Sequence, residues 1–279
     1  MENGAIIVIA ANDNFFQFMK ASIYDIRYNL GNKTKIIGYD LGGISENKQM
    51  INELNNVCNF ELRIFNFTIL PLSVRKLTIF AWKIVIIAEI LKEYPTMIYA
   101  DASVRLYYDG FNNYFDRIED ETISGLQMPS NGGHKLYKYI PHYWEEISSG
   151  ESLKEMHEAN FMIIHRNEYT RKLLKWLKIN KYKIKIKLKK RAILCAYTLE
   201  CIDPPGAKIN CEHPYIGIAK CHRQDQKQEI LIKNKENGKK FYSHYDDQNP
   251  RIYPNGFFGI MRRLPLRKNL NFEKAVKCN

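Results

Sequence analysis

The sequence has little that would place it in a membrane. No uninterrupted apolar run approaches the roughly 18 residues that a transmembrane helix requires, and the first residues lack the basic and then apolar layout of a signal peptide. A strand-like run begins at Ala5 and leaves no room for an N-terminal anchor unless the chain is truncated. As written, the chain is expected to be soluble and to carry no membrane anchor.

Several other signatures are missing. The turn from Ala10 to Asn14 has no glycine-rich fingerprint, which argues against a Rossmann-type methyltransferase. No nucleic-acid-binding module, internal repeat or interdomain linker is recognisable. With 279 residues, of which 45% are hydrophobic, the chain can bury a substantial core, so disorder is not expected.

Positive charge is in excess. The 42 Lys and Arg residues outnumber the 30 Asp and Glu residues, and the net charge of +12 favours a polyanionic partner such as a nucleotide diphosphate, nucleic acid, anionic polysaccharide or lipid headgroup. Between Lys178 and Arg191, lysines alternate with apolar residues, as in an amphipathic strand. This lysine face is either a solvated edge that resists aggregation or a stripe that binds an acceptor or a polyanion. The alternating lysines are Lys181, Lys183, Lys185, Lys187 and Lys189.

The six cysteines are unevenly distributed. Four are clustered, whereas Cys58 and Cys278 lie far from them. The clustering predicts disulfides; a structural zinc site and free buried thiols are the alternatives, although the ten-residue gaps lack the close pairs typical of zinc knuckles. Disulfides would place the protein in an oxidising compartment. The clustered cysteines are Cys195, Cys201, Cys211 and Cys221.

Strand and helix patterns alternate through the first hundred residues in the order β-α-β-α-β-α-β. Continuous apolar runs predict buried strands, and apolar residues at helical spacing predict the helices between them. Thr78 is expected to cap the third helix and Pro95 to end it. The alternation predicts a Rossmann-like α/β sheet with helices on both faces, whose ligands bind beyond the carboxyl ends of the strands. The expected strands are Ala5 to Ala10, Lys35 to Tyr39, Phe60 to Phe65 and Thr96 to Ala100, and the helices are Asn14 to Leu30, Ser45 to Asn55 and Thr78 to about Leu91.

The second half is less regular. Strands are expected near Thr122 to Met128 and at Ala159 to Ile164, with a flexible segment from Pro129 to His134 and a helix near Lys135 to Ile147 between them. Asn167 is expected to cap a further helix.

Polar residues follow two of the expected strands. Ala11-Asn12-Asp13 follows the first and Asp101-Ala102-Ser103 the fourth, so both segments face the same rim of the sheet. An enzyme that uses a sugar nucleotide commonly holds a divalent metal between hard oxygen ligands and the diphosphate. Asp101 supplies one carboxylate, and Ser103 is a weak ligand. Without further context, Asp101 is equally a polar residue that holds a turn.

Three blocks of sequence resemble the GT-A-type glycosyltransferases and, more closely, an uncharacterised animal family assigned to the nucleotide-diphospho-sugar transferase fold. The resemblance covers roughly residues 5 to 235. It implies a GT-A-like mixed sheet with helices on both faces. The blocks are Ala81-Trp82-Lys83 through Ile87-Ala88-Glu89 to Tyr99-Ala100-Asp101-Ala102-Ser103-Val104-Arg105, then Cys201-Ile202-Asp203-Pro204-Pro205-Gly206-Ala207, and Cys221-His222-Arg223-Gln224-Asp225-Gln226.

The resemblance also implies roles at the rim. Ala11-Asn12-Asp13 is expected near the base and ribose, and Asp101 and Ser103 occupy the positions of an Asp-x-Asp signature that binds Mn²⁺ or Mg²⁺. The chain departs from that signature at Ser103, so metal dependence is either lost or supported by another group. His244 is a candidate ligand because related enzymes often recruit a late histidine; as a solitary histidine it is otherwise a surface residue.

Further polar positions are expected near the transferred sugar. Glu158 and Asn160 resemble the segment that faces the donor sugar and the acceptor, and Asp225 and Gln226 resemble the acidic position beside that sugar. Asp225 is a general base in an inverting reaction, orients the donor in a retaining one, or caps a helix.

Basic residues are candidates for the diphosphate. Lys83 either neutralises a diphosphate oxygen as the leaving group departs or is a solvated helix lysine. Arg105 and Arg223 are alternative phosphate partners, and His222 is either a contact of the diphosphate or a local structural residue.

Together with this resemblance, the sequence predicts a glycosyltransferase that moves a sugar from a nucleotide diphosphate donor to a hydroxyl on a glycan or protein. The resemblance implies that the donor is a UDP-sugar. Residues 1–279 are expected to form one domain, with a nucleotide-binding part at about 1–105 and an acceptor and sugar part at about 106–279. The alternatives are a catalytically inactive GT-A-fold protein that binds glycans or acts as a scaffold, and a basic nucleic-acid-binding protein, although no nucleic-acid partner is expected. The resemblance implies the Golgi or ER lumen or secretion, and the missing signal leaves the cytoplasm open.

Overall fold

The computed structural model describes residues 6–106, 126–127, 130–135, 155–157, 160–167, 170, 196–203, 259–261 and 271–278. No helix in these ranges is long and apolar enough to span a membrane. The strands are β1 (Ile6–Ala11), β2 (Ile36–Asp40), β3 (Phe60–Ile64), β4 (Thr96–Asp101), β5 (Val104–Leu106), β6 (Leu126–Gln127), β7 (Ser130–Lys135), β8 (Glu155–His157), β9 (Phe161–His165) and β10 (Gly259–Met261). The α-helices are α1 (Phe16–Leu30), α2 (Lys48–Asn55), α3 (Ala81–Glu93), α8 (Leu199–Ile202) and α10 (Phe272–Val276), and the 3₁₀ turns are η1 (Asp13–Phe15), η2 (Phe67–Ile69), η3 (Leu72–Val74) and η4 (Leu77–Ile79).

A six-stranded sheet with the order β3-β2-β1-β4-β9-β6 organises the described part of the chain. Strands β3, β2, β1 and β4 are parallel, whereas β9 runs antiparallel to both β4 and β6. Two small antiparallel pairs, β5 with β10 and β7 with β8, accompany it. This topology confirms the expected fold class, a mixed α/β sheet with helices on both faces.

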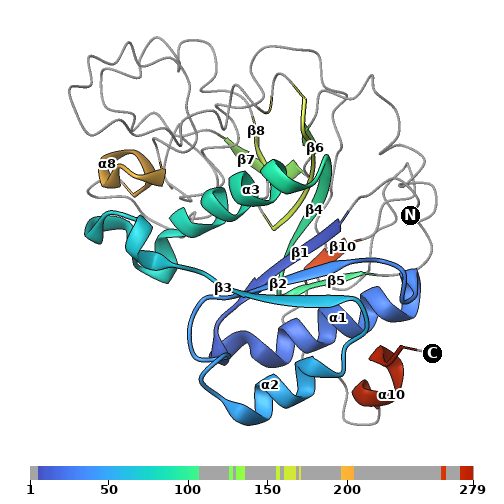
Figure 1. Ribbon diagram of the computed structural model, residues 1–279. Helices are drawn as coiled ribbons and strands as arrows, with labels where there is room; N and C mark the ends of the chain where they lie inside the picture. The colour runs from blue at the N-terminus through green and yellow to red at the C-terminus, as the bar shows by residue number, and fades with distance from the viewer. Residues whose placement is uncertain are drawn as a thin grey trace.

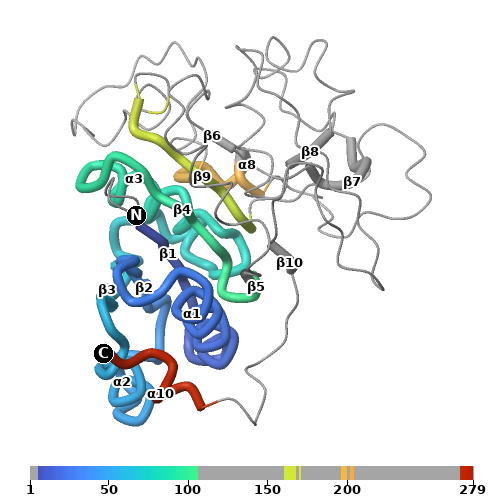
Figure 2. Tube along the Cα trace, turned by 90° about the vertical axis from the view of Figure 1, so that its right-hand side faces the viewer, coloured from blue at the N-terminus to red at the C-terminus, as the bar shows by residue number. Residues whose placement is uncertain are grey.

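The two faces of the sheet bury separate cores, because successive residues of a strand point to opposite sides. Ile6 and Val8 of β1 belong to the core beneath α3, whereas Ile7 and Ile9 belong to the core beneath α1 and α2. Figure 1 shows α3 on one side of the sheet and α1 and α2 on the other. The C-terminal helix α10 lies beside α1, as Figure 2 shows from a second direction, and adds Phe272 to that core.

Most expected elements of the first hundred residues are confirmed within a few residues, but the cap of the third helix is wrong. Thr78 lies inside η4, and α3 begins after Phe80, which adopts a left-handed conformation with φ of 57°. Residues 130–134 of the segment expected to be flexible belong to strand β7.

The expected cap at Asn167 is confirmed. The Asn167 side chain accepts a hydrogen bond from the Thr170 backbone N–H at 2.8 Å, and the Thr170 hydroxyl accepts one from the Asn167 N–H at 2.9 Å. Such reciprocal bonds are typical of a helix N-terminus. The helix expected to follow lies outside the described residues, as does the lysine-rich segment from 178 to 191. Of the helix expected near Lys135 to Ile147, Lys135 belongs to strand β7 and the other residues lie outside the described ranges.

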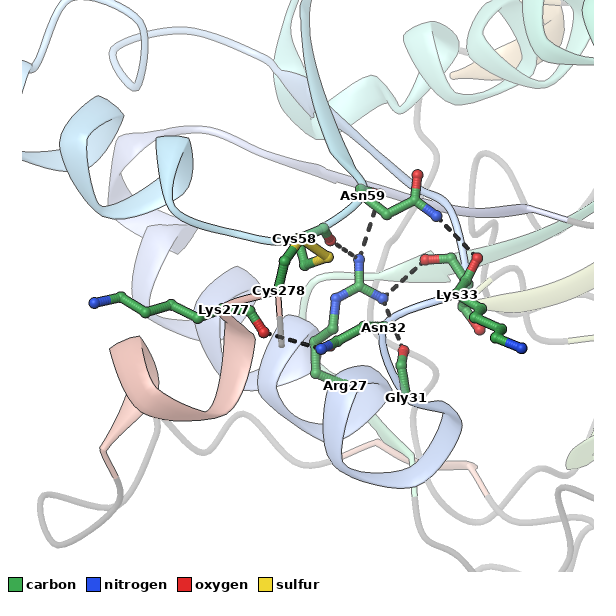
Figure 3. The surroundings of a disulfide bond; sticks show 9 residues. Arg27, Gly31, Asn32, Lys33, Cys58, Asn59, Lys277 and Cys278 are labelled. Carbon is green, nitrogen blue, oxygen red and sulfur yellow. Dashed lines mark hydrogen bonds between the residues drawn. A yellow bond between two sulfur atoms is a disulfide. The ribbon is translucent and has the colours of Figure 1, made fainter.

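A disulfide joins Cys58 and Cys278, which are 220 residues apart in sequence. It fastens the C-terminal end next to the loop between α2 and β3 (Figure 3). The Cys58 N–H also donates to the Val276 carbonyl. The sequence pattern drew attention to the four clustered cysteines and left these two apart. Cys195, Cys211 and Cys221 of that cluster lie outside the described ranges.

Candidate functional site

Two of the polar segments expected at strand ends meet at one rim. Strands β1 and β4 are adjacent and parallel, and their register places Ala10 opposite Asp101. Asn12-Asp13 and Asp101-Ala102-Ser103 therefore leave the sheet side by side, as expected. The chain runs outward from β1 through β2 to β3 and then returns to place β4 on the other side of β1. This reversal makes the rim a topological switch point, where ligands of open α/β sheets bind.

The Asp101 carboxylate contacts two neighbouring side chains, those of Lys83 and Tyr99. The Lys83 ammonium lies 3.1 Å from Asp101 Oδ1, and the Tyr99 hydroxyl donates a hydrogen bond of 2.9 Å to the same oxygen. The Asp101 side chain is 29% exposed, whereas the Lys83 side chain is only 2% exposed. The rim thus presents a partly open carboxylate whose counter-charge is buried behind it.

Lys83 is a buried cation, so the reading of this residue as a solvated helix lysine is wrong. It stands in the first turn of α3, and its ammonium lies 5.3 to 5.9 Å from the ring centroids of Phe80, Trp82 and Tyr99. Aromatic faces attract a cation through their quadrupole, most strongly where water is excluded. Burial and the aromatic surroundings orient Lys83 toward Asp101.

The segment after β1 is fixed by its own backbone and by the neighbouring loop. The Asn12 side chain accepts a hydrogen bond from the Phe15 N–H and caps η1, and the Asp13 N–H donates to the Gly42 carbonyl at 3.0 Å. The Asp13 side chain is exposed, and its Oδ1 accepts from the Asn14 N–H. Asp13 therefore points outward from a well-defined turn.

Asp40 is a structural residue of this rim that was not among the candidate residues expected from the sequence. Its buried carboxylate at the end of β2 accepts hydrogen bonds from the backbone N–H groups of Gly42, Ile44 and Ser45. These bonds hold the loop that faces Asp13. An aspartate followed by Leu41 and two glycines was the available signal, because such a side chain commonly bonds to backbone N–H groups just ahead of it.

Asn160 lies beside Asp101 on the opposite side from β1. Its carbonyl accepts a hydrogen bond of 2.8 Å from the Asp101 N–H, and the residue is buried directly before β9. Ser103, two residues beyond Asp101, is partly exposed in the turn before β5. The structure therefore brings Asn12, Asp13, Lys83, Asp101, Ser103 and Asn160 to one end of the sheet, with Ala11 at the end of β1.

Other expected site residues are placed elsewhere or lie outside the described residues. Arg105 makes two hydrogen bonds to the Asp25 carboxylate of α1, so its guanidinium joins β5 to that helix. The remaining candidates fall outside the described ranges; they are Glu158, His222, Arg223, Asp225, Gln226 and His244.

The described residues do not fit a divalent metal. Within them, no group of three or more His, Cys, Asp or Glu side chains gathers closely enough to hold a metal ion. Asp101 is the one carboxylate of the expected Asp-x-Asp pair, and its Oδ1 already faces an ammonium and a hydroxyl donor. Of the expected ligands, Ser103 is neutral and His244 lies beyond the described ranges.

Comparisons with known proteins provide limited further information. The family model described as "Protein of unknown function (DUF1647)" matches residues 1–88. No curated protein matches the chain.

Several solved glycosyltransferases are similar to the chain in structure. The bifunctional glycosyltransferase WbbM shares 14% identity over 65% of this chain and 36% of its own, with a TM-score of 0.44. The galactosyltransferase LgtC, in complex with donor and acceptor sugar analogs, shares 17% identity over 57% of each chain, with a TM-score of 0.38. Mouse xyloside xylosyltransferase 1 shares 10% identity over 82% of this chain and 80% of its own, with a TM-score of 0.42. The match thus spans about a third to somewhat over half of the length of WbbM and LgtC.

Proposed function

We propose that the chain is a glycosyltransferase that moves a sugar from a nucleotide diphosphate donor, a UDP-sugar, to a hydroxyl on a glycan or protein. The observation that carries the proposal is the Asp101–Lys83 pair at the switch point between β1 and β4. A carboxylate with a buried cation, at the edge where α/β sheets bind nucleotides, suits a ligand that combines hydroxyl groups with a diphosphate. The motif around Asp101 supports the same assignment through its resemblance to GT-A-type enzymes.

The reaction is a displacement at the anomeric carbon of the donor sugar. The bond from that carbon to the diphosphate oxygen breaks, and the nucleoside diphosphate leaves with the electron pair. A bond to the acceptor oxygen forms, and the proton of the acceptor hydroxyl passes to a base. The protein has to hold the donor, balance the charge that develops on the diphosphate, and orient the acceptor.

The rim residues suit separate parts of this task. Asn12 and Asp13 are proposed to contact the base and ribose, because they lie on the turn beyond β1 and Asp13 is exposed. Asp101 and Asn160 are proposed to bind the donor sugar, and Lys83 to supply positive charge on the diphosphate side. Glu158 and Asp225 are proposed to act at the sugar and the acceptor hydroxyl.

A second candidate function is glycan or nucleotide binding without turnover. It is favoured by one specific observation: Ser103 stands where the second carboxylate of an Asp-x-Asp pair would be. The two functions differ in whether a bound UDP-sugar is consumed.

The Cys58–Cys278 disulfide supports a location in an oxidising compartment. We propose the Golgi or ER lumen or the extracellular space, in agreement with a glycan or protein acceptor.

Titration calorimetry with UDP, followed by assays of UDP release from a panel of UDP-sugars, tests the proposal. The wild-type protein is expected to bind UDP and to release it from at least one UDP-sugar in the presence of an acceptor. Asp101→Asn removes the carboxylate with little change in volume and is expected to abolish release. Glu273→Gln, an exposed carboxylate on α10, is the matched control and should behave as wild type. UDP binding without release from any donor would favour the binding function. No UDP binding would contradict the proposed transferase and leave glycan binding as the remaining candidate.

A further inference from the structure

A buried lysine is paired with one oxygen of the Asp101 carboxylate at this rim. Resting on the proposed function, we infer that Lys83 is the resident cation of this rim and that nucleoside diphosphate binding there needs no divalent metal. The pair joins α3 to β4 through a 3.1 Å contact, with Lys83 almost entirely buried. In this arrangement the positive charge belongs to the protein and does not depend on an ion from solution.

Asp101 Oδ1 lies next to two hydrogen-bond donors, the Lys83 ammonium and the Tyr99 hydroxyl, which a metal ion bound to this oxygen would have to displace. A hard divalent cation binds carboxylate oxygens at about 2.0–2.6 Å. The same oxygen is 3.1 Å from the Lys83 ammonium and 2.9 Å from the Tyr99 hydroxyl. A metal at bonding distance from Oδ1 would lie close to a buried positive charge, and like charges in a poorly solvated site repel strongly.

Lys83 cannot readily make room for such an ion. The ammonium is enclosed by the rings of Phe80, Trp82 and Tyr99, and the side chain starts from the first turn of a buried helix. A buried charge is costly unless it stays paired, so moving the ammonium away from Asp101 is disfavoured.

In the described part of the chain, two further acidic side chains near this rim, Asp40 and Asp13, accept hydrogen bonds from the backbone. Asp40 is buried and accepts from three N–H groups, and Asp13 Oδ1 accepts from the Asn14 N–H. The position two residues after Asp101 is Ser103, whose neutral hydroxyl is a weak ligand. In the described part of the rim, the balance therefore favours a fixed ammonium over a recruited metal.

The inference makes a prediction about exchanging one cation for another. Lys83→Met keeps the length and apolar stem of the side chain but removes the ammonium that lies against Asp101 Oδ1. In EDTA, this variant is expected to bind UDP about 10-fold more weakly, which is the effect expected from the loss of one charged contact. It is also expected to gain Mn²⁺ binding. Lys83→Arg keeps the charge and is expected not to gain Mn²⁺ binding.

Two measurements test the inference. The first is UDP titration in EDTA and in Mn²⁺, where the wild-type affinity is expected to be the same in both. The second is titration of Mn²⁺ alone, followed by electron paramagnetic resonance, where wild type is expected to leave Mn²⁺ free and Lys83→Met to bind it. Lys92→Met changes an exposed lysine on the same helix and should match wild type in both measurements.

The outcomes separate this inference from the proposed function. Loss of wild-type UDP binding in EDTA, or Mn²⁺ binding by wild type that Asp101→Asn removes, overturns the inference and leaves the proposed function standing. Failure to bind UDP in either buffer contradicts the proposed function, and the inference falls with it. Both wild-type measurements remain decisive if Lys83→Met does not fold.

Discussion

Gly43 and Asp13 touch across the loops at the rim. Gly43 has a positive φ of 87°, and a Cβ atom built on it would lie 2.7 Å from Asp13 Cγ. The position requires glycine for two reasons, because other residues are strained at this φ and because the added carbon would displace the Asp13 side chain.

Gly43→Ala is therefore expected to lower the free energy of unfolding by about 1–3 kcal/mol and to weaken UDP binding. Gly42→Ala is the matched control, since Gly42 also has a positive φ but a Cβ there would meet nothing within 4 Å. Urea denaturation and UDP titration of the two variants provide the measurement. Equal UDP affinities would show that Asp13 takes no part in binding.

His165 provides a pH-dependent contribution to stability at the opposite end of β4. Burial lowers the pKa of His165 below its ordinary value of 6.5. Its Nδ1 lies 3.0 Å from the Thr96 hydroxyl, and its buried Nε2 has no hydrogen-bond partner in the described part of the chain. Below pH 6.5 the unfolded chain takes up a proton that the folded chain resists, so stability is lost as the pH falls.

The free energy of unfolding, measured between pH 7 and pH 5, should decrease as the pH falls. One titrating group can account for at most about 1.4 kcal/mol per pH unit. His165→Asn should reduce the slope while the other histidines still titrate. An unchanged slope in the variant would mean that His165 is protonated equally in both states.

At the scale of elements, α3 begins in an unusual way. Phe80 precedes it with φ of 57°, and Trp82 Nε1 donates to the Leu77 carbonyl at 3.0 Å. A left-handed bulky residue costs free energy and persists where packing compensates. This start of the helix brings Phe80, Trp82 and Lys83 together beside Asp101. The strained residue Phe80 therefore lies next to the candidate site.

A second connection between elements joins α1 to β5. The Arg105 guanidinium donates to both oxygens of the Asp25 carboxylate, and each side chain is 12% exposed. Breaking one partner of such a buried pair leaves an uncompensated charge.

Asp25→Asn is accordingly expected to destabilise the protein by about 3 kcal/mol, measured by urea denaturation. Arg105→Gln should cost a similar amount, and the double variant should cost less than the sum of the two. Strict additivity would contradict a direct pairing of the two side chains.

At the scale of the whole molecule, the C-terminus is tied to the first half of the fold. The Cys58–Cys278 disulfide lies beside Arg27, a buried arginine that donates to the carbonyls of Gly31, Thr34, Cys58 and Asn59 (Figure 3). Burial lowers the pKa of Arg27 to about 10, still far above neutral pH. The guanidinium and the disulfide together organise the loop before β3.

Removal of this disulfide is expected to be costly because it closes a loop of 220 residues. The loop-entropy relation gives about 5 kcal/mol. Urea unfolding of oxidised wild type and of the Cys58→Ser/Cys278→Ser double variant measures the difference, and any effect of reductant on the variant reports on the other cysteines. Equal stability of the two oxidised proteins would contradict a structural role.

Some features of the molecule were available from short-range pattern alone. The runs at Ala5 to Ala10 and Thr96 to Ala100 became β1 and β4, and the polar residues after them came to share a rim. Burial pattern and chain direction are local, and parallel neighbours in α/β sheets end at the same edge, so the candidate site could be located from the sequence. The burial of Lys83 could not be predicted from the sequence. Helix α3 is apolar on most of its surface, so only tertiary packing decides which of its side chains contact the sheet.

The sequence by itself determined the order of the first strands and helices, the fold class and the position of Asp101, because these follow from hydrophobic periodicity along neighbouring residues. Tertiary structure alone decided the antiparallel direction of β9, the pairing of Lys83 with Asp101 and the joining of Cys58 to Cys278. Each of these depends on residues that are distant in sequence and come together only when the sheet assembles and its helices pack on it, so no local pattern records the contact.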